Sequence, residues 1–386
     1  MSSLYFDNAS TTFPSENSVK VFNATLTQFP ANPSSSHKLG EEAFKCLTQA
    51  REQVASLLCT DEPSNIVFTS SATEANNIVM QSLIACEKRG RVIISDAEHP
   101  SIAENKTILE RCGFEVVTLK TEYGIVNKDE LMKKLTPDTV LVAIMYVNNV
   151  TGAVNDIPTL ASTVLEYKNN MKKNILFHAD SVQAAGKISI NADTLKKCGV
   201  TSLSFSGHKF NAPRGCGILL SSNALIRSLS KGGGQENGRR AGTENLAAIC
   251  STAASLKEAT EDIKTTEKHY SELKATLIGE LNKKIGSSLK VLSLENSTPA
   301  IVSLSLKGLA GEITVRAASE KGIYIGTTSA CSSNAKKSDK KALVNMGYSA
   351  QEERDAIRVS FCKDNTKDDV LTLCNTLSDI FQKYHA

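Results

Sequence analysis

Residues 174–183 read NILFHADSVQ, an apolar run that ends in polar side chains. A short continuous apolar run with a polar end is typical of a strand that is buried on both faces, as in a parallel sheet. A second run of this kind ends in residues 204–210, SFSGHKF. Because the ligands of open α/β sheets lie at the carboxyl ends of the strands, the two runs predict that Asp180, Gln183 and Lys209 share one sheet edge.

Similar runs alternate with helix-like segments from about Ser15 to about Leu256. They occupy residues 66–69, 91–95 and 140–147. Regular alternation of strands and helices predicts a mostly parallel sheet that helices cover. The predicted fold class is therefore α/β, with a large domain over residues 15–256.

The pattern changes after a long helical stretch at about 258–284. Strand-like runs at 300–306, 322–326 and 356–361 precede a final helix over about 366–384. This mixture predicts a smaller α+β domain over residues 257–386, which the N-terminal segment 1–14 joins.

Composition indicates an ordinary globular protein. Of its 386 residues, 41% are hydrophobic and 22% are charged, and the net charge of +3 is too small to indicate a nucleic-acid or membrane partner. The start lacks a signal-peptide pattern, and no apolar run approaches about 20 residues, so we expect a cytoplasmic protein. The ten cysteines form no Cys-x-x-Cys pair, so neither a zinc site nor a disulfide framework is expected.

A lysine and a carboxylate at one sheet edge suit pyridoxal phosphate chemistry. Lys209 would bind the aldehyde of the cofactor covalently, and Asp180 would keep the pyridine nitrogen protonated. Gln183 would donate a hydrogen bond to the phenolic oxygen. A lysine in the position of Lys209 is more often simply solvated, and an aspartate in the position of Asp180 more often caps a helix. The prediction therefore depends on the combination of the two residues.

Small and hydroxyl side chains mark the predicted phosphate site. Thr73 opens a helix directly after the run 66–69, where free backbone N–H groups suit an anion. Ser206 and His208, beside Lys209, are further candidate phosphate donors. A helix cap without a ligand is the alternative for Thr73.

Two more polar residues follow predicted strands. His99 could stack on the cofactor ring and move protons, although a histidine in this place is more often structural. Asn149 could contact the ring or a substrate carboxylate. Both should lie at the same carboxyl edge of the sheet.

The predicted small domain contributes two candidates. Cys331 lies in residues 326–335, GTTSACSSNA, where small polar neighbours favour an exposed thiol, and nearby lysines would favour its thiolate. Arg358 is a cation within a predicted strand. It is either a surface charge or, in a cleft between domains, a fork for a substrate carboxylate.

Matches to one known family run along nearly the whole chain. In order they are residues 5–12 (YFDNASTT), 32–37 (NPSSSH), 68–77 (FTSSATEANN), 98–99 (EH), 148–149 (NN), 180–183 (DSVQ), 206–209 (SGHK), 232–236 (GGGQE), 240–243 (RAGT), 329–331 (SAC) and 357–358 (IR). With these motifs the chain resembles the cysteine desulfurases of the NifS/IscS type. They belong to the class V aminotransferase-like enzymes of fold-type I, which depend on pyridoxal phosphate.

The resemblance implies a role for each matched residue. Ala72, Thr73, Ser206 and His208 would hold the cofactor phosphate, joined by Thr243 from the partner subunit of a homodimer. His99 would stack on the ring and transfer protons, and Asn149 and Gln183 would contact the cofactor. Asp180 would pair with the pyridinium, and Lys209 would form the covalent bond.

The resemblance also implies the reaction. Arg358 would bind the carboxylate of L-cysteine, and Cys331 would attack the sulfur of the cysteine–cofactor adduct, which releases L-alanine and leaves a persulfide on the enzyme. The persulfide sulfur would then pass to an acceptor protein of iron–sulfur cluster assembly or tRNA thiolation. The family usually continues the Ser-Ala-Cys motif with Leu-Glu-Pro, whereas this chain has KKSDKK at 336–341, so the acceptor stays open.

Three alternatives remain: two other enzymes, and a non-catalytic sulfur-carrier or scaffold-binding protein. A selenocysteine lyase would use the same site on a selenium substrate. An aminotransferase of the same fold would have no use for Cys331.

Overall fold

The computed structural model describes residues 3–85, 89–223, 226–327 and 342–384. Its largest sheet has seven strands in the order β2-β10-β9-β8-β7-β3-β4. These strands are β2 (Ile66–Thr69), β3 (Arg91–Ser95), β4 (Glu115–Leu119), β7 (Thr139–Met145), β8 (Leu176–Asp180), β9 (Ser202–Ser206) and β10 (Gly217–Ser221). All pair in parallel except β10, which runs antiparallel to β2 and β9. The predicted mostly parallel sheet is confirmed.

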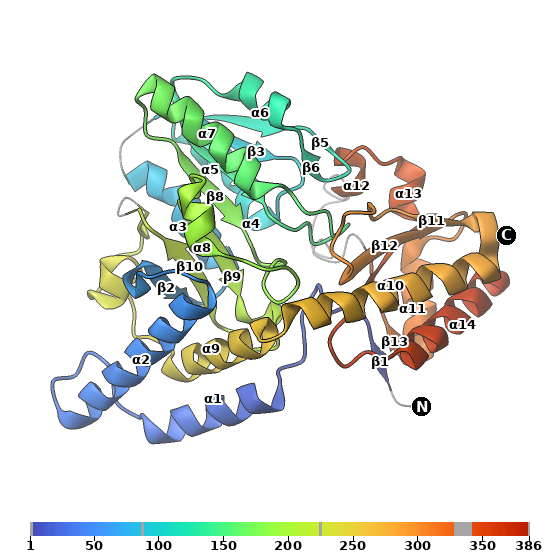
Figure 1. Ribbon diagram of the computed structural model, residues 1–386, viewed down its shortest axis with the longest axis horizontal. Coiled ribbons are helices and arrows are strands. Elements are labelled where there is room, and N and C mark those ends of the chain that lie inside the picture. The colour runs from blue at the N-terminus through green and yellow to red at the C-terminus, as the bar shows by residue number, and fades with distance from the viewer. Residues whose placement is uncertain (1–2, 86–88, 224–225, 328–341, 385–386) are drawn as a thin grey trace.

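Helices cover both faces of this sheet (Figure 1). The apolar side chains of its strands pack into two cores, one on each face. In β7, Leu141 packs toward one face and Val142 toward the other. This arrangement explains why the strands read as continuous apolar runs. One face carries α3 (Ala72–Ala85), α4 (Pro100–Ala103) and α5 (Asn105–Arg111), and the other carries α2 (Lys38–Leu57), α7 (Ile157–Met171), α8 (Ala192–Lys197) and α9 (Leu246–Thr260).

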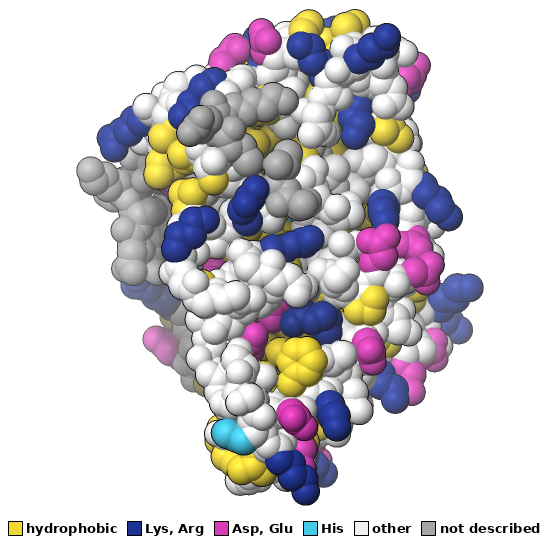
Figure 2. Space-filling model, turned by 90° about the vertical axis from the view of Figure 1, so that its left-hand side faces the viewer, with side chains coloured by type: hydrophobic (Ala, Val, Ile, Leu, Met, Phe, Trp, Pro, Cys, Tyr) yellow, Lys and Arg dark blue, Asp and Glu magenta, His cyan; other side chains and the backbone are white. Residues whose placement is uncertain are grey.

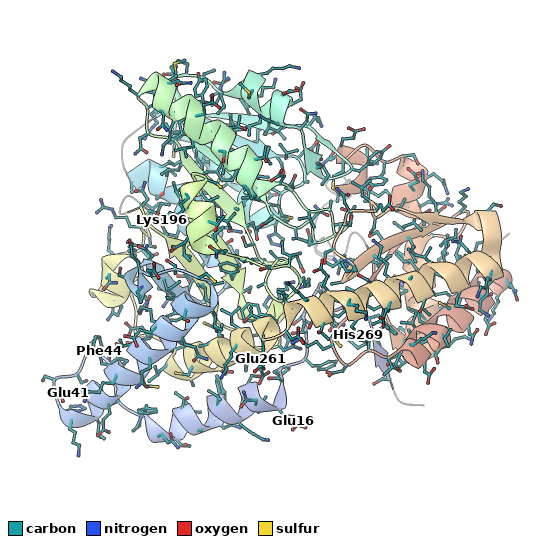
Figure 3. All side chains as sticks on the ribbon, in the orientation of Figure 1. Glu16, Glu41, Phe44, Lys196, Glu261 and His269 are labelled. Carbon is teal, nitrogen blue, oxygen red and sulfur yellow. The ribbon has the colours of Figure 1, made fainter. Side chains whose placement is uncertain are left out.

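Outer elements complete this part of the molecule. Helix α1 packs on α9, and α6 packs on α7. Phe44 on α2 is 56% exposed, and Figure 3 labels it on the outer side of that helix. The remaining bounds are α1 (Glu16–Gln28), α6 (Lys128–Lys134), β5 (Thr121–Glu122), β6 (Ile125–Val126), and the 3-10 turns η1 (Pro63–Asn65), η2 (Gly207–Lys209) and η3 (Gln235–Gly238).

A second sheet has four strands in the order β11-β12-β15-β14. Apolar side chains of three helices pack on it and form a separate core. The strands are β11 (Leu289–Val291), β12 (Ile301–Leu306), β14 (Gly326–Thr327) and β15 (Ala356–Ser360), and the helices are α10 (Ile263–Ile285), α11 (Gly311–Glu320) and α14 (Lys367–Tyr384). The short elements η4 (Gly286–Ser288), α12 (Ala342–Asn345) and α13 (Ala350–Arg354) complete the set. The predicted boundary between residues 256 and 257 falls within α9, and the division into two domains stays a prediction.

Two predicted elements are divided in the structure. The helical stretch 258–284 belongs to α9 and α10, which are separate because Asp262 leaves the helical conformation and caps the N-terminus of α10. The single strand predicted at 322–326 is β13 (Ile323–Tyr324) and β14. These two pieces pair with different partners, β1 (Leu4–Tyr5) and β15, so one continuous strand was wrong.

The N-terminal segment connects the two sheets. After β1, Asp7 bridges to Ser360 of β15. The backbone N–H of Thr12 then donates to the carbonyl of His208, at the end of the seven-stranded sheet. Residues 7–12 therefore run from one sheet to the other.

The charge distribution agrees with the small net charge. Figure 2 shows a face on which basic and acidic side chains both occur, with no field of one sign covering it. Within the described ranges, none of the helices combines the length and apolar character that a membrane span requires.

Candidate active site

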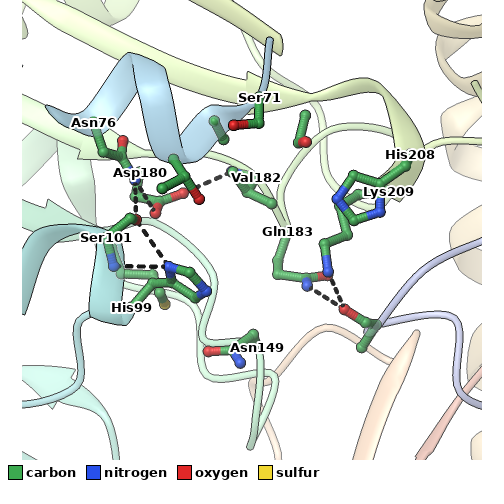
Figure 4. A pocket seen from close by; sticks show the side chains of 15 residues that line it. Ser71, Asn76, His99, Ser101, Asn149, Asp180, Val182, Gln183, His208 and Lys209 are labelled. Carbon is green, nitrogen blue, oxygen red and sulfur yellow. Dashed lines mark hydrogen bonds between the residues drawn. The ribbon is translucent and has the colours of Figure 1, made fainter. Parts of the chain in front are cut away.

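A cavity lies at the carboxyl edge of the seven-stranded sheet (Figure 4). The cavity has a volume of about 180 Å³ and is partly open to solvent. The segments that follow β2, β3, β7, β8 and β9 all reach it, together with the N-terminal segment. Its lining residues are Ala9, Ser71, Ala72, Thr73, Asn76, His99, Ser101, Met145, Asn149, Asp180, Val182, Gln183, Ser206, His208 and Lys209.

Most of the predicted site residues meet in this cavity. Those that line it are Ala72, Thr73, His99, Asn149, Asp180, Gln183, Ser206, His208 and Lys209. Thr243 lines a different pocket, with Ser70 and Arg240. Arg358 lies beside Asn149 but does not line the cavity. Cys331 lies outside the described residues.

One end of the cavity is the amino terminus of α3. Ser71, Ala72 and Thr73 line it there, where backbone N–H groups lack partners within the helix. The turn lies directly against β10. A Cβ atom on Gly217 would be 2.3 Å from the carbonyl carbon of Ser71 and 2.7 Å from the amide nitrogen of Ala72. Glycine at the start of β10 is therefore needed for this turn to keep its position.

Two ion pairs fix the surroundings of this turn. The carboxylate of Glu74 accepts from the backbone N–H of Ser70 and pairs with Arg240 at 2.8 Å. Glu236, whose side chain is fully buried, forms two hydrogen bonds with Arg51, at 2.7 and 2.8 Å. The glycine-rich segment that contains Glu236 and Arg240 is thus held against the β2–α3 connection.

Asp180 ends β8 and is almost fully buried. Its Oδ1 accepts from the backbone N–H of Val182 at 3.0 Å, and its Oδ2 accepts from Nδ2 of Asn76 at 2.9 Å. Both carboxylate oxygens are therefore oriented by donors of the protein.

Lys209 lies across the cavity, in η2. Its Nζ donates to the carbonyl of Ala9 at 2.8 Å and also to that of Ser10. Gln183 donates from Nε2 to the same Ala9 carbonyl at 2.8 Å, as Figure 4 shows. The side-chain oxygen of Gln183, Oε1, is buried and has no hydrogen-bond partner among the described residues.

His208 is a neutral imidazole in this environment. Burial lowers its pKa to about 4, and the charges of Lys209, Arg214 and Lys187 act in the same direction. Its Nδ1 lies 3.1 Å from Oγ1 of Thr11. A neutral histidine beside Lys209 can donate to an anion without adding a charge of its own.

His99 directly precedes α4 and caps its amino terminus. Its Nδ1 accepts from the backbone N–H of Ser101 at 3.1 Å and lies 2.8 Å from the Ser101 hydroxyl. Because a backbone N–H can only donate, Nδ1 is an acceptor, so a neutral ring carries its hydrogen on Nε2.

Glu98, next to His99, has an unusual carboxyl group. The pKa of Glu98 is raised to about 8, chiefly by burial and in addition by the charges of Asp180 and Asp96. The hydrogen bonds from Ser95 and Met145 act in the opposite direction and lower the pKa. Its Oε1 accepts from the Ser95 hydroxyl at 2.5 Å and from the Met145 N–H at 2.7 Å. Oε2 is buried without a partner among the described residues.

Arg358, in β15, is 2% exposed. Its guanidinium donates to Oδ1 of Asp7 and to the backbone carbonyl of Asn149, each at 2.8 Å. Its Nε is buried and lacks a partner among the described residues. The arginine is therefore held between the N-terminal segment and the loop after β7.

Six lining residues were not predicted from the sequence, namely Ala9, Ser71, Asn76, Ser101, Met145 and Val182. Ala9 contributes only a backbone carbonyl, which no side-chain pattern reveals. Asn76 follows Thr73 by three residues and so shares its helix face, which is the one signal that could have identified it.

Comparisons with known proteins agree with this geometry. Residues 4–373 match the family model "Aminotransferase class-V". A "NifS/IcsS protein homolog" of Lactobacillus delbrueckii subsp. bulgaricus is 36% identical, and the alignment covers 99% of this chain and 98% of the relative. A "Cysteine desulfurase" of Nostoc sp. is 34% identical over 100% of this chain and 94% of its own length.

A solved structure of a "NIFS-LIKE PROTEIN" superposes with a TM-score of 0.89 at 33% identity, and covers 99% of this chain and 100% of its own. Both the sequence and the fold thus match proteins of one kind over nearly their full length. The chain belongs to the class V aminotransferase family and, within it, to the cysteine desulfurases of the NifS/IscS type.

Proposed function

We propose that this protein is a cysteine desulfurase that uses pyridoxal phosphate to convert L-cysteine to L-alanine and to transfer the sulfur to its own Cys331. One observation carries the proposal. The amine of Lys209, the carboxylate of Asp180 and the amino terminus of α3 face a single cavity. An amine, an acid and an anion site at one sheet edge are the groups that this cofactor requires.

The residues present fit the cofactor. The α3 turn, Ser206 and His208 would hold its phosphate, and Asp180 would pair with the ring nitrogen. The buried Oε1 of Gln183 supports a ligand here, because an isolated buried oxygen is costly unless a further group pairs with it. When bound, pyridoxal phosphate supplies an electron-withdrawing ring that weakens the bonds around the substrate α-carbon.

The chain's own side chains would control proton transfer. Lys209 is held by carbonyls of the N-terminal segment, which orient its amine toward the cavity. His99 would present its Nε2 side, because Nδ1 is occupied by Ser101. Both groups act as proton carriers only when their neighbours fix their geometry.

Arg358 and Asn149 would bind the substrate carboxylate. Arg358 is a fork donor with an unused Nε, and it already contacts the backbone of Asn149. In the reaction, the Cβ–Sγ bond of L-cysteine breaks and an S–S bond to Cys331 forms. A proton is added to Cβ, so the products are L-alanine and an enzyme persulfide.

The quaternary arrangement is part of the proposal. In a homodimer, Thr243 would reach the phosphate site of the partner subunit. The persulfide would pass to an acceptor protein of iron–sulfur cluster assembly or tRNA thiolation.

The test combines a spectrum with a product assay. The purified protein should show the visible absorbance of bound pyridoxal phosphate, lose it on borohydride reduction, and release alanine from L-cysteine. Lys209→Ala should abolish the borohydride-trapped adduct. Cys331→Ala should keep the cofactor and lose the persulfide, which mass spectrometry detects on the intact protein.

A second cysteine provides the control. Cys59 is exposed in the structure, so Cys59→Ala should leave persulfide formation unchanged. Full sulfide production by Cys331→Ala would contradict the proposed role of the thiol. A keto acid product instead of alanine would indicate an aminotransferase.

A further inference from the structure

A buried hydrogen-bond chain connects two groups of the proposed active site that do not touch each other. It begins with Ser202 and His178 and reaches Asn76, where it divides. One branch leads from Asn76 to Asp180, and the other leads through Ser101 to His99. Figure 4 shows both branches. Asn76, His178 and Ser202 are each at most 1% exposed. None of these three residues has a part in the function proposed above.

The orientation of the Asn76 amide follows from its partners. One of them is the carboxylate of Asp180, which only accepts when ionised, so the atom that faces it at 2.9 Å is the amide nitrogen. The second hydrogen on Nδ2 is directed at the hydroxyl oxygen of Ser101, 2.8 Å away. The amide oxygen, Oδ1, is therefore left to face His178.

His178 fixes that orientation from behind. Its Nε2 lies 2.9 Å from Oδ1 of Asn76 and must donate, so its Nδ1 accepts from the Ser202 hydroxyl at 2.9 Å. Burial lowers the pKa of His178 to about 4, although the charge of Asp180 opposes this, so the ring is neutral near pH 7. A neutral ring in one tautomer prevents the Asn76 amide from turning over.

One branch of the hydrogen-bond chain ends at His99. Since the Ser101 oxygen accepts from Asn76, its own hydrogen is free for Nδ1 of His99 at 2.8 Å. Every donor in the chain thus points the same way, from the sheet toward the cavity. We propose that Asn76 is a positioning residue that orients the carboxylate of Asp180 and, through Ser101, the ring of His99. The proposal rests on the proposed function, in which Asp180 and His99 face the cofactor.

The experiment compares Asn76→Ala with Asn77→Ala in the full-length protein. Asn77 is the next residue on the same helix and forms no hydrogen bond with Asp180 or Ser101; its amide nitrogen donates to the carbonyl of Thr73, and its Oδ1 accepts from Gln81 and Asn105. Two properties are measured: the dissociation constant for pyridoxal phosphate, after its removal and titration back, and the ring ¹⁵N resonances of His99. The ring resonances of His99 are identified as those that are missing from the spectrum of His99→Gln.

We expect Asn76→Ala to weaken cofactor binding about tenfold, because it removes a hydrogen bond to a charged group. It should also move the Nδ1 resonance of His99, because the Ser101 hydroxyl is then free to turn. Asn77→Ala should change neither property. In a Ser101→Ala background, Asn76→Ala should still weaken cofactor binding but should no longer move the His99 resonance.

Wild-type values of both properties in a folded Asn76→Ala protein would overturn the inference, and so would a loss of thermal stability alone. If the alanine variant does not fold, Asn76→Ser gives the same test, because its single hydroxyl hydrogen cannot be donated to both Asp180 and Ser101. Failure of the proposed function would be seen separately, as a wild-type protein that binds no pyridoxal phosphate. The His99 spectrum would still report on the hydrogen-bond chain.

Discussion

Replacing Glu98 with glutamine tests whether a protonated carboxyl group lies behind His99. The pKa of Glu98 is raised from 4.5 to about 8, chiefly by burial. Oε1 accepts two hydrogen bonds, so the proton resides on Oε2 near pH 7. Glutamine reproduces this arrangement, because its oxygen can accept the same two bonds and its NH₂ group replaces the protonated oxygen.

The sign and size of the effect follow from proton linkage. A group whose pKa is higher in the folded state contributes stability that is complete below its unfolded pKa and is lost as the pH rises toward the folded pKa. The window for Glu98 is therefore about pH 4.5 to pH 8. At about 1.4 kcal/mol per pH unit, the wild type should lose roughly 2 kcal/mol relative to Glu98→Gln between pH 5.5 and pH 7, with an upper limit of about 5 kcal/mol over the window.

Urea unfolding of both proteins across this pH range measures the difference in free energy of unfolding. Replacing Glu41, an exposed glutamate of α2, with glutamine should give no pH-dependent difference. The Glu98 carboxyl can also be followed directly by its ¹³C resonance. A titration of that resonance near pH 4.5, or a pH-independent difference between the two proteins, would refute the reasoning.

Three further changes have outcomes that the structure predicts. Arg358→Lys keeps the charge but loses the fork to Asp7 and Asn149, so KM for L-cysteine should rise about tenfold with unchanged cofactor affinity; an unchanged KM would exclude the proposed carboxylate site. Glu236→Gln leaves Arg51 without its buried partner and should lower the free energy of unfolding by about 3 kcal/mol, measured by urea titration, whereas a wild-type midpoint would show that the pair contributes nothing. Gly217→Ala should displace the α3 turn and weaken pyridoxal phosphate binding at least tenfold in a cofactor titration. Gly279→Ala, which has open space around its Cβ position, should bind the cofactor normally, and equal affinities of the two variants would contradict the proposed phosphate site.

The sequence predicted the sheet and the meeting of its polar strand ends for a simple reason. Strands buried on both faces read as apolar runs, and parallel strands bring their carboxyl ends to one edge. Asp180, Gln183 and Lys209 come from two such strands, and all three line the cavity. The resemblance to a family added Ala72, whose side chain carries no chemical signal.

Contacts between elements could not be predicted in the same way. Asn76 and Ser82 are the two polar residues among the buried residues of α3, and only the packing of α3 on β8 brings the Asn76 amide to Asp180. The division of 322–326 into β13 and β14 likewise depends on which strands lie nearby, because Ile323, Tyr324 and Ile325 all favour a strand and none of them signals a break. The break before α10 had a local signal, since Asp262 precedes Thr265 at the spacing of a helix cap.

The course of the N-terminal segment has a practical consequence for anyone who handles this protein. Asp7 contacts Arg358, and the carbonyl of Ala9 accepts from both Lys209 and Gln183. Trimming the first ten residues, as is common when a flexible end is removed to aid crystallisation, would thus remove several contacts of the proposed active site at once. We expect an affinity tag to be better tolerated at the carboxyl terminus, after α14, than a truncation at the amino terminus.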